Sequence, residues 1–283
     1  MKVGITSYAF RWAVSTDKKF GEEISAIKLM EPQDLIRKTA ELGLEVVQIC
    51  ENVDLNIPEK KLRNLSKTAE DLNVTLELGT VGLSKPVIER YLNISMLTNA
   101  RLIRVYPNER EPISEIVERL RSFSPILRSK ELTLAIENSS LCLYTSRQLA
   151  EIMRKVNSPH VGACVDVANS IGLLEKPIET VKILSQYAVS LHVKDYRIER
   201  NSAGGGFTIY GVPLGKGMLD LKAILKIVKH TGRDPNILLE QFISQKQNRM
   251  ETLSEEERWV REGIKYLKLL LKKEQSVKIR NQE

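Results

Sequence analysis

The segment LTLAIE at residues 132–137 decides the fold, together with VGACVD at 161–166, AVSLH at 188–192 and ILLE at 237–240. Each is a short apolar run that ends in an ionisable residue. Apolar runs of this length are typical of strands buried on both faces, as in a parallel sheet. The carboxyl ends of such strands meet at the rim where α/β barrels place their active sites. The four terminal side chains are therefore candidates for one functional site: Glu137, Asp166, His192 and Glu240.

Strand-like runs alternate with helix-period segments along the whole chain. The sequence predicts eight strands, over residues 3–7, 45–50, 74–78, 102–106, 132–137, 162–166, 189–194 and 237–240. It predicts eight helices, over residues 32–42, 59–72, 85–97, 113–128, 146–156, 177–187, 219–230 and 251–272. Pro32, Pro58 and Pro177 suit first helical turns, and Thr145 or Ser146 suits an N-cap. The repeat of about 30 residues is typical of βα units.

Eight βα units predict the α/β class, as a (β/α)8 TIM barrel that forms one single domain over residues 1–283. The length also allows two smaller domains. An open, doubly wound sheet is the alternative, but its nucleotide-binding fingerprints are missing. No GxGxxG turn follows the first strand, and GVPLGKG at 211–217 is one residue too short between glycines for a P-loop and lacks the serine or threonine.

Composition restricts the partners. The net charge of +7 and the pI of 9.2 suggest nucleic acid as a partner, but the Lys and Arg residues are spread over helical segments and only 5% of residues are aromatic. We therefore expect a small molecule and no nucleic acid. No apolar run is long enough to span a membrane, and we expect the protein to carry no leader. Cys50, Cys142 and Cys164 are odd in number and far apart. We expect them to be buried and free of disulfides, in a cytoplasmic protein.

The four candidate residues form a donor set for a divalent cation. Three carboxylates and one imidazole favour Mn²⁺, with Mg²⁺, Co²⁺ and Zn²⁺ as alternatives. Each residue alone has a plainer interpretation as a helix cap or an ion pair, but four on consecutive strands favour metal. A metal on carbonyl and hydroxyl oxygens stabilises an enediolate while a carboxylate moves the proton. The metal-bound carbonyl group could equally accept the electrons released when CO₂ or water leaves the substrate. The four candidate ligands alone therefore do not distinguish isomerisation, epimerisation, decarboxylation and dehydration.

Four motifs carry a resemblance: AIEN at 135–138, CVDVAN at 164–169, LHVKD at 191–195 and LLEQ at 238–241. They resemble the xylose isomerase-like TIM-barrel superfamily of sugar and sugar-phosphate isomerases and epimerases. The resemblance implies a metal held by the four candidates, with Glu137 and Glu240 as catalytic acid and base. It also implies substrate contacts from Asn138 and Asn169. However, many epimerases have a histidine where Asn169 stands, which argues against an ordinary ketose epimerase. Relatives in the superfamily are often homodimers or homotetramers.

A finer resemblance concerns YAFRW at 8–12, QICEN at 48–52 and HVKDY at 192–196. These segments are similar to a subgroup that decarboxylates sugar acids of the 3-oxo-isoapionate type. Arg11, Lys194 and Arg197 are expected near the catalytic rim, where they would bind a substrate carboxylate or phosphate. Arg104 is a further candidate from inside the barrel, although an ion pair is the plainer interpretation. The glycine-rich residues 195–218 are expected to form a loop that acts as a lid, with a floppy insertion as the alternative.

The leading hypothesis is an isomerase or epimerase that uses an enediolate and paired glutamates on a sugar, sugar phosphate or sugar acid. The alternative is a metal-dependent decarboxylase of a 3-oxo sugar acid at the same residues. An AP endonuclease-type DNA repair enzyme needs a His-rich zinc cluster, whereas this chain has three histidines: His160, His192 and His230. A sensor that binds sugar acids without turning them over is the remaining hypothesis.

Overall fold

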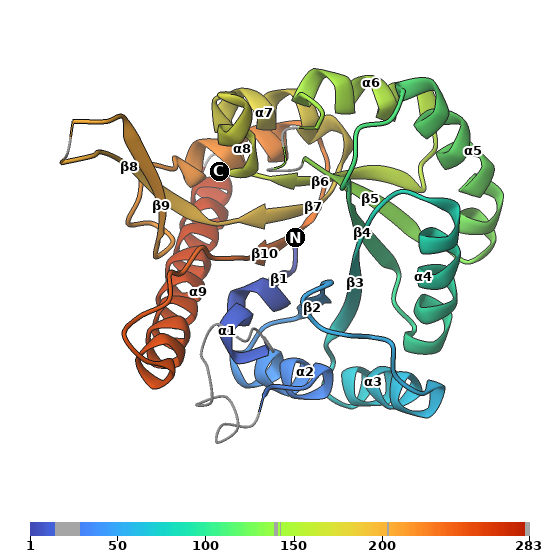
Figure 1. Ribbon diagram of the computed structural model, residues 1–283, viewed down its shortest axis with the longest axis horizontal. Helices are drawn as coiled ribbons and strands as arrows, with labels where there is room; N and C mark the ends of the chain where they lie inside the picture. Colours follow the sequence, from blue (N-terminus) through green and yellow to red (C-terminus); the bar gives the residue numbers. More distant parts are fainter. Residues whose placement is uncertain (15–28, 139–140, 142, 203, 281–283) are drawn as a thin grey trace.

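The eight predicted strands close into a parallel barrel (Figure 1). The computed structural model describes residues 1–14, 29–138, 141, 143–202 and 204–280. The barrel strands are β1 (Val3–Thr6), β2 (Val46–Ile49), β3 (Thr75–Val81), β4 (Leu102–Tyr106), β5 (Thr133–Glu137), β6 (Val161–Asp166), β7 (Ala188–Val193) and β10 (Asn236–Leu239). Their order is β1-β10-β7-β6-β5-β4-β3-β2, and every pairing is parallel. The predicted (β/α)8 barrel is confirmed, and the open sheet is excluded.

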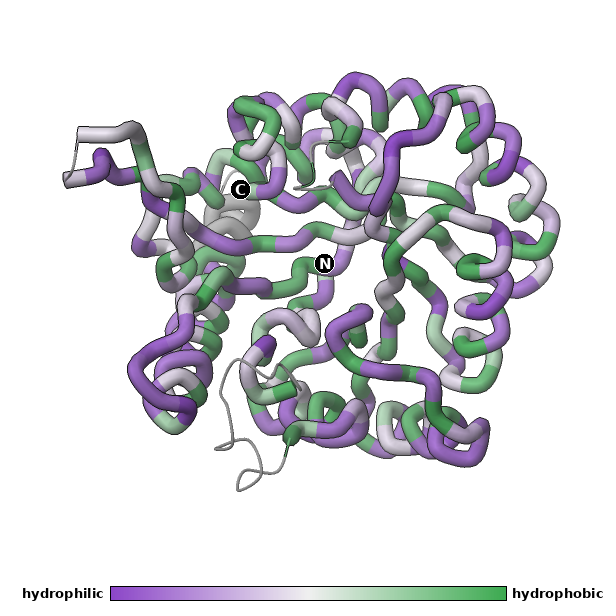
Figure 2. Tube along the Cα trace, viewed as in Figure 1, coloured by the Kyte–Doolittle hydropathy of each residue, from purple (hydrophilic) through white to green (hydrophobic). Residues whose placement is uncertain are grey.

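Helices surround the barrel, as Figure 1 shows. They are α2 (Pro32–Glu41), α3 (Glu59–Asp71), α4 (Lys85–Thr98), α5 (Ile113–Ser129), α6 (Ser146–Val156), α7 (Pro177–Leu184), α8 (Leu221–His230) and α9 (Arg249–Arg280). Thr145 caps α6 in a capping box, and Pro32 and Pro177 lie in first turns as predicted. Pro58 is instead the N-cap residue of α3. Green and purple alternate along these helices in Figure 2, because one face of each packs on the barrel and the other meets solvent.

The barrel closes tightly at β1, where a glycine is required. A Cβ atom at Gly4 would lie 2.1 Å from the carbonyl oxygen of Val46 in β2.

Short helical segments then lead the chain away from β1: η1 (Ser7–Phe10) and α1 (Arg11–Val14). The Glu256 side chain of α9 accepts hydrogen bonds from the backbone N–H groups of Trp12 and Ala13. This contact fixes the segment that carries Tyr8 and Arg11 to the rest of the molecule.

The segment after β7 is more regular than the predicted glycine-rich loop, and its action as a lid stays a prediction. It forms an antiparallel hairpin of β8 (Asp195–Arg200) and β9 (Phe207–Val212), which projects beyond the barrel at the left of Figure 1. The Asp195 carboxylate accepts hydrogen bonds from the backbone N–H groups of Gly215, Gly217 and Leu219. A Cβ at Gly217 would lie 2.1 Å from Asp195 Oδ1, so this glycine serves close packing.

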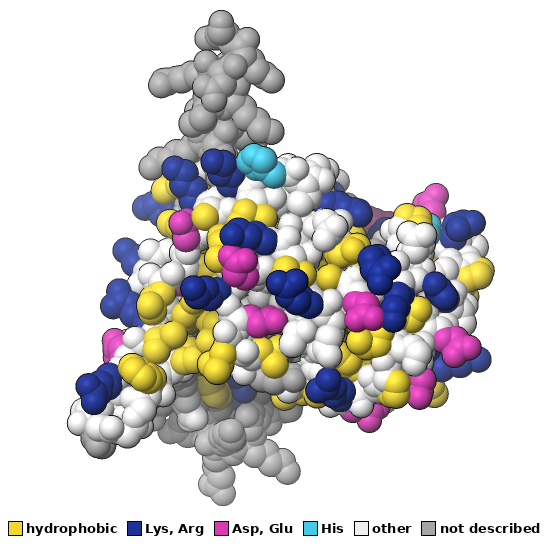
Figure 3. Space-filling view, turned by 90° about the horizontal axis from the view of Figure 1, so that it is seen from above, with side chains coloured by type: hydrophobic (Ala, Val, Ile, Leu, Met, Phe, Trp, Pro, Cys, Tyr) yellow, Lys and Arg dark blue, Asp and Glu magenta, His cyan; other side chains and the backbone are white. Residues whose placement is uncertain are grey.

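Three further expectations concern cysteines, membranes and assembly. Cys50 and Cys164 are buried free thiols, as predicted, and Cys142 lies outside the described residues. Within the described ranges, no helix combines the length and the apolar character needed to cross a bilayer. On the face that Figure 3 shows, Lys and Arg side chains alternate with Asp and Glu and gather into no continuous basic surface. The expected homodimer or homotetramer stays a prediction.

Candidate active site

A cavity of about 400 Å³ opens at the carboxyl ends of the barrel strands. Its walls come from residues that follow β1, β2, β5, β6, β7 and β10 and from residues within β3, β4 and β5. They are Tyr8, Arg11, Glu51, Val81, Arg104, Tyr106, Glu137, Leu141, Asn169, Lys194, Glu240, Gln241 and Phe242. Active sites of α/β barrels lie at this end of the strands, so this is the candidate site.

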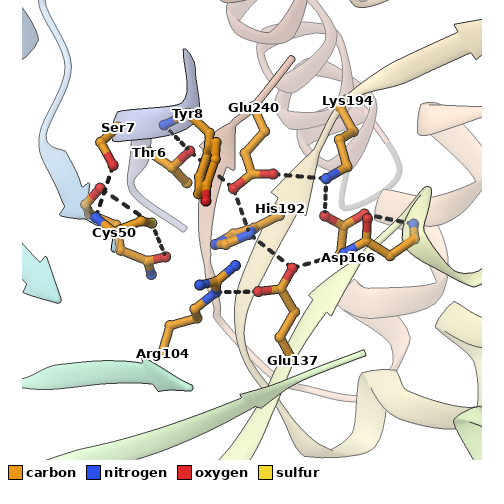
Figure 4. Close-up of polar contacts among 12 residues, drawn as sticks. Thr6, Ser7, Tyr8, Cys50, Arg104, Glu137, Asp166, His192, Lys194 and Glu240 are labelled. Carbon is orange, nitrogen blue, oxygen red and sulfur yellow. Dashed lines mark hydrogen bonds and ion pairs between the residues drawn. The ribbon is translucent and has the colours of Figure 1, made fainter. Parts of the chain in front are cut away.

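The structure brings the four predicted ligands together, as Figure 4 shows. Strand register explains the convergence, because Asp166 and Leu238 both pair with His192 in adjacent strands. The His192 Nδ1 atom lies 3.2 Å from Glu240 Oε1 and 3.7 Å from Glu137 Oε1. One ligand atom from each of Asp166, His192 and Glu240 lies within 4.8 Å of the others, and all three residues are buried.

Two cations of the chain flank this cluster in Figure 4. The Lys194 ammonium lies 2.6 Å from Asp166 Oδ2 and 2.8 Å from Glu240 Oε2. Arg104 Nε donates to Glu137 Oε2, and the same guanidinium lies 2.7 Å from Glu51 Oε2. Lys194 and Arg104 are each 3% exposed, so both ion pairs are shielded from water. The chain itself therefore supplies part of the positive charge that the buried carboxylates need.

The pKa values of the carboxylates record this balance. Burial alone would raise the pKa of Glu137, but Arg104 and His192 hold it below its ordinary value. Burial likewise opposes ionisation of Glu240, but Lys194 and His192 hold its pKa well below the ordinary value. For Asp166 burial prevails over Lys194, and the pKa is raised. Arg104, Lys194 and His192 together thus favour the charged form of the glutamates but leave Asp166 short of positive charge.

A divalent cation fits these residues on the evidence of their unsatisfied atoms. His192 Nδ1 faces Glu240 Oε1 at 3.2 Å and Asp166 Oδ2 meets the Lys194 ammonium at 2.6 Å, whereas His192 Nε2 is a buried ring nitrogen without a hydrogen-bond partner among the described residues. Buried polar atoms of this kind need an explanation, and an ion is one. Glu137 Oε1 and Oε2 and both Glu240 oxygens already accept hydrogen bonds, but each carboxylate oxygen keeps a second lone pair. The donor set is the one predicted from the sequence.

Cys164 adds a thiol beneath the cluster, which sequence reasoning treated only as a buried residue. It is the strand partner of Glu137, and its sulfur lies within 4.8 Å of donor atoms of Glu137 and His192. Burial raises the pKa of this thiol to about 11, so it is protonated at neutral pH. The hard ions that carboxylates favour prefer oxygen and imidazole donors to a thiolate, which leaves the carboxylates and the imidazole as the main donors.

The two asparagines predicted to bind substrate hold the cluster in place. Asn138 Oδ1 accepts from the backbone N–H of Asp166, and its Nδ2 donates to the carbonyl oxygen of the same residue, both at 2.8 Å. Asn169 Nδ2 donates to Glu137 Oε1 at 3.0 Å and also lines the cavity. Asn169 therefore fixes Glu137. It does so from the position at which many epimerases of the superfamily have a substrate-binding histidine.

The two predicted arginines differ in position. Arg11 lines the cavity, with its guanidinium 5.4 Å from the centre of the Trp12 ring. Arg197 lies on the hairpin, is exposed, and donates twice to the carbonyl oxygen of Lys216. It is absent from the cavity walls because β8 carries it away from the barrel mouth. The structure thus does not bring Arg197 to the predicted substrate site.

Sequence reasoning missed two polar residues at the site: Glu51, which lines the cavity, and Thr6, which contacts Glu240. Thr6 Oγ1 donates to Glu240 Oε1 at 3.1 Å, and Tyr8 donates through its hydroxyl to Glu51 Oε1 at 3.0 Å. Both follow or end strands at the catalytic rim, as the four ligands do, so their position was a usable signal. They were overlooked because neither ends a conspicuously long apolar run.

Comparisons with known proteins agree with the barrel fold. Residues 36–270 match the family described as xylose isomerase-like TIM barrel. The chain is 29% identical to 3-oxo-isoapionate decarboxylase of Pectobacterium atrosepticum over 94% of this chain and 95% of that protein. Its fold is similar to D-psicose 3-epimerase solved with D-fructose, with a TM-score of 0.70 and 14% identity over 96% and 99% of the two chains. It is also similar to a xylose isomerase-like protein of Mycobacterium smegmatis in complex with magnesium, with a TM-score of 0.65 and 15% identity over 91% and 97%.

Proposed function

Because the chain belongs to the xylose isomerase-like TIM barrel family, we propose that it is a divalent-metal-dependent decarboxylase of a 3-oxo sugar acid. The decarboxylase name of the Pectobacterium relative supports this reaction class, since the similarity extends over nearly the whole of both chains. The sequence alone favoured an isomerase or epimerase at the same residues, with the decarboxylase as the alternative. The charges in the cavity favour the decarboxylase.

The charge balance around the cavity carries the proposal. Three cations, Arg11, Arg104 and Lys194, line the cavity together with the carboxylates Glu51, Glu137 and Glu240, and Asp166 contacts Lys194 as a fourth carboxylate. A bound divalent cation turns the resulting single negative charge into a single positive charge, with His192 neutral as a ligand. One substrate carboxylate balances that charge. A neutral ketose leaves it unpaired, and a phosphate dianion exceeds it.

The side chains that would hold the ion are Glu137, Asp166, His192 and Glu240. When bound, such an ion supplies positive charge that draws electrons toward a substrate carbonyl oxygen. In decarboxylation of a 3-oxo acid, the bond between the carboxylate and its neighbouring carbon breaks. CO₂ leaves, the electron pair forms an enolate with the 3-oxo group, and one proton then adds to the carbon. The chain needs no base to start this sequence.

The hydrogen bonds of the glutamates suit that chemistry. Both oxygens of Glu137 accept hydrogen bonds, from Arg104 and Asn169, and both oxygens of Glu240 accept them, from Thr6 and Lys194. Donors on each oxygen weaken a carboxylate as a base and suit it to hold charge. Apolar walls also face the cavity, from Val81, Leu141 and Phe242. They offer a surface to the neutral CO₂ that forms.

The experiment measures CO₂ release and hydrogen exchange with the same protein. Metal-stripped protein is supplied in turn with Mn²⁺, Mg²⁺, Co²⁺ or Zn²⁺ and given a panel of 3-oxo sugar acids and ketoses in D₂O. We expect CO₂ from an acid, only with metal, and no exchange into ketoses. His192→Gln should abolish the reaction. The matched control is His160→Gln, because His160 precedes β6 at the other end of the barrel and contacts the Leu132 carbonyl oxygen.

The second candidate is an isomerase or epimerase, which the presence of both Glu137 and Glu240 in the cavity wall favours. Solvent deuterium in a ketose without any CO₂ release would replace the decarboxylase by this function. A protein that binds metal and sugar acids but shows neither reaction would be a sensor.

A further inference from the structure

A hydrogen-bonded chain reaches the cavity beside the metal ligands. The Tyr8 hydroxyl donates to Glu51 Oε1 at 3.0 Å, and Arg104 Nη1 donates to Glu51 Oε2 at 2.7 Å. Arg104 Nε continues the chain to Glu137. The proposed bond cleavage gives Tyr8 and Glu51 no role, although both line the cavity.

The backbone holds Tyr8 at a fixed place in the wall. It lies on η1 directly after β1, and its N–H donates to Thr6 Oγ1, the hydroxyl that also donates to Glu240. In Figure 4 the Tyr8 hydroxyl points toward the group formed by Glu240, His192 and Glu137. Tyr8 and the proposed ligands therefore face a common space.

The proposed reaction needs a proton donor after CO₂ has left. The carboxylate oxygens of Glu137 and Glu240 are acceptors, and the ammonium of Lys194 is directed to Asp166 and Glu240. Tyr8 carries a hydroxyl proton and is joined to Glu51, which is 23% exposed. A partly exposed carboxylate connects the phenol to solvent protons.

Resting on the proposed decarboxylation, we propose that Tyr8 delivers the proton that replaces CO₂ and that Glu51 returns a solvent proton to Tyr8. The Tyr8 O–H bond breaks as the enolate electron pair forms the new C–H bond, and Tyr8 is left as a phenolate. Glu51 takes a proton from water and passes it to the phenolate oxygen. One solvent proton is thereby consumed for each CO₂ released, and the enzyme returns to its starting state.

The charge state of Tyr8 agrees with this role. Burial, and then the neighbouring Glu51 carboxylate, raise the pKa of Tyr8 far above its ordinary value. The phenol is therefore protonated throughout the neutral pH range. An enolate carbon is a stronger base than a phenolate, so transfer from the phenol to the carbon is still favourable.

The face from which the proton arrives tests the assignment. The holoenzyme is given its 3-oxo acid in D₂O, and NMR determines on which face of the carbon the deuterium lies. A donor fixed in the wall gives one diastereomer with the wild-type protein. Tyr8→Phe keeps the ring but loses the proton, so we expect CO₂ release with deuterium on both faces. The matched control is Tyr210→Phe, whose hydroxyl contacts Glu199 on the exposed hairpin and should leave one diastereomer.

The outcomes separate the two proposals. If the wild-type protein releases no CO₂ from any 3-oxo acid, the decarboxylase assignment fails and the role of Tyr8 fails with it. If CO₂ is released and Tyr8→Phe still gives the single wild-type diastereomer, only the role of Tyr8 is wrong. Glu51→Gln keeps the phenol, so we expect slower turnover with deuterium on one face. Deuterium on both faces in Glu51→Gln would contradict the order in which Glu51 acts after Tyr8.

Discussion

Replacing Arg104 by methionine should destabilise the protein by about 3–5 kcal/mol, the usual cost of removing one partner from a buried ion pair. Methionine keeps an apolar stem of similar length but removes the guanidinium, so the loss is mainly of charge. Glu137 is 1% exposed and would lose its main cation, whereas Glu51 is 23% exposed and can be hydrated. The cost therefore arises almost entirely from Glu137.

Chemical denaturation in EDTA at neutral pH measures this cost, without stabilisation by a bound ion. The variants are Arg104→Met, Glu137→Gln and the double variant. We expect the double variant to be more stable than the sum of the single effects by about 1–3 kcal/mol, because removing the carboxylate charge relieves the defect. The control is Arg258→Met on α9, an arginine that is 50% exposed and also contacts two carboxylates. Surface pairs of this kind contribute about 0.5 kcal/mol.

Two results would refute this reasoning. One is a cost for Arg104→Met no larger than that for Arg258→Met, which would mean that water or a rearranged side chain compensates Glu137. The other is strict additivity in the double variant, which would mean that the two charges do not interact.

Three further predictions concern the hairpin, pH and metal. Gly217→Ala should lower the free energy of unfolding by about 1–3 kcal/mol, measured with denaturant, because the new Cβ meets Asp195. Gly205→Ala is the control, since open space surrounds Gly205 and the change should stay within about 0.5 kcal/mol. Equal effects of the two substitutions would contradict the packing role of Gly217. The pKa of Glu256 is raised by burial from 4.5 to about 8, so the folded state holds its proton more tightly. The contribution of the protonated Glu256 to stability is complete below pH 4.5 and is lost as the pH rises through 8. The wild type should therefore lose more thermal stability between pH 5 and pH 9 than Glu256→Gln does. Parallel pH profiles of the two proteins would show that Glu256 does not titrate in this way. Divalent metal at about 100 times its Kd should raise the unfolding free energy by about 2.7 kcal/mol, an effect that His192→Gln should remove in calorimetry.

The barrel and the convergence of four candidate ligands could be predicted because a short-range pattern determines both. An apolar run that ends in a polar residue marks a buried strand and its carboxyl end, and a parallel barrel brings all such ends to one rim. Glu137, Asp166, His192 and Glu240 are each within a residue of a strand end, so their convergence required no knowledge of loop conformation. The hairpin was missed because the glycines at positions 204–206, 211, 215 and 217 suggested an irregular loop, although residues 195–200 and 207–212 pair as strands.

Only the tertiary structure decided which charged groups pair within that rim. Arg104 and Glu137 lie on adjacent strands, but their contact depends on side-chain direction and on the absence of a better partner. Tyr8 and Glu51 come from segments 43 positions apart, and their hydrogen bond exists because β1 and β2 are neighbours in the closed barrel. The position of Arg197 could not be predicted either, because it depends on the hairpin, which holds this side chain outside the cavity. The sequence by itself determines where strands end, whereas partner choice is set by burial, register and competition among nearby charges.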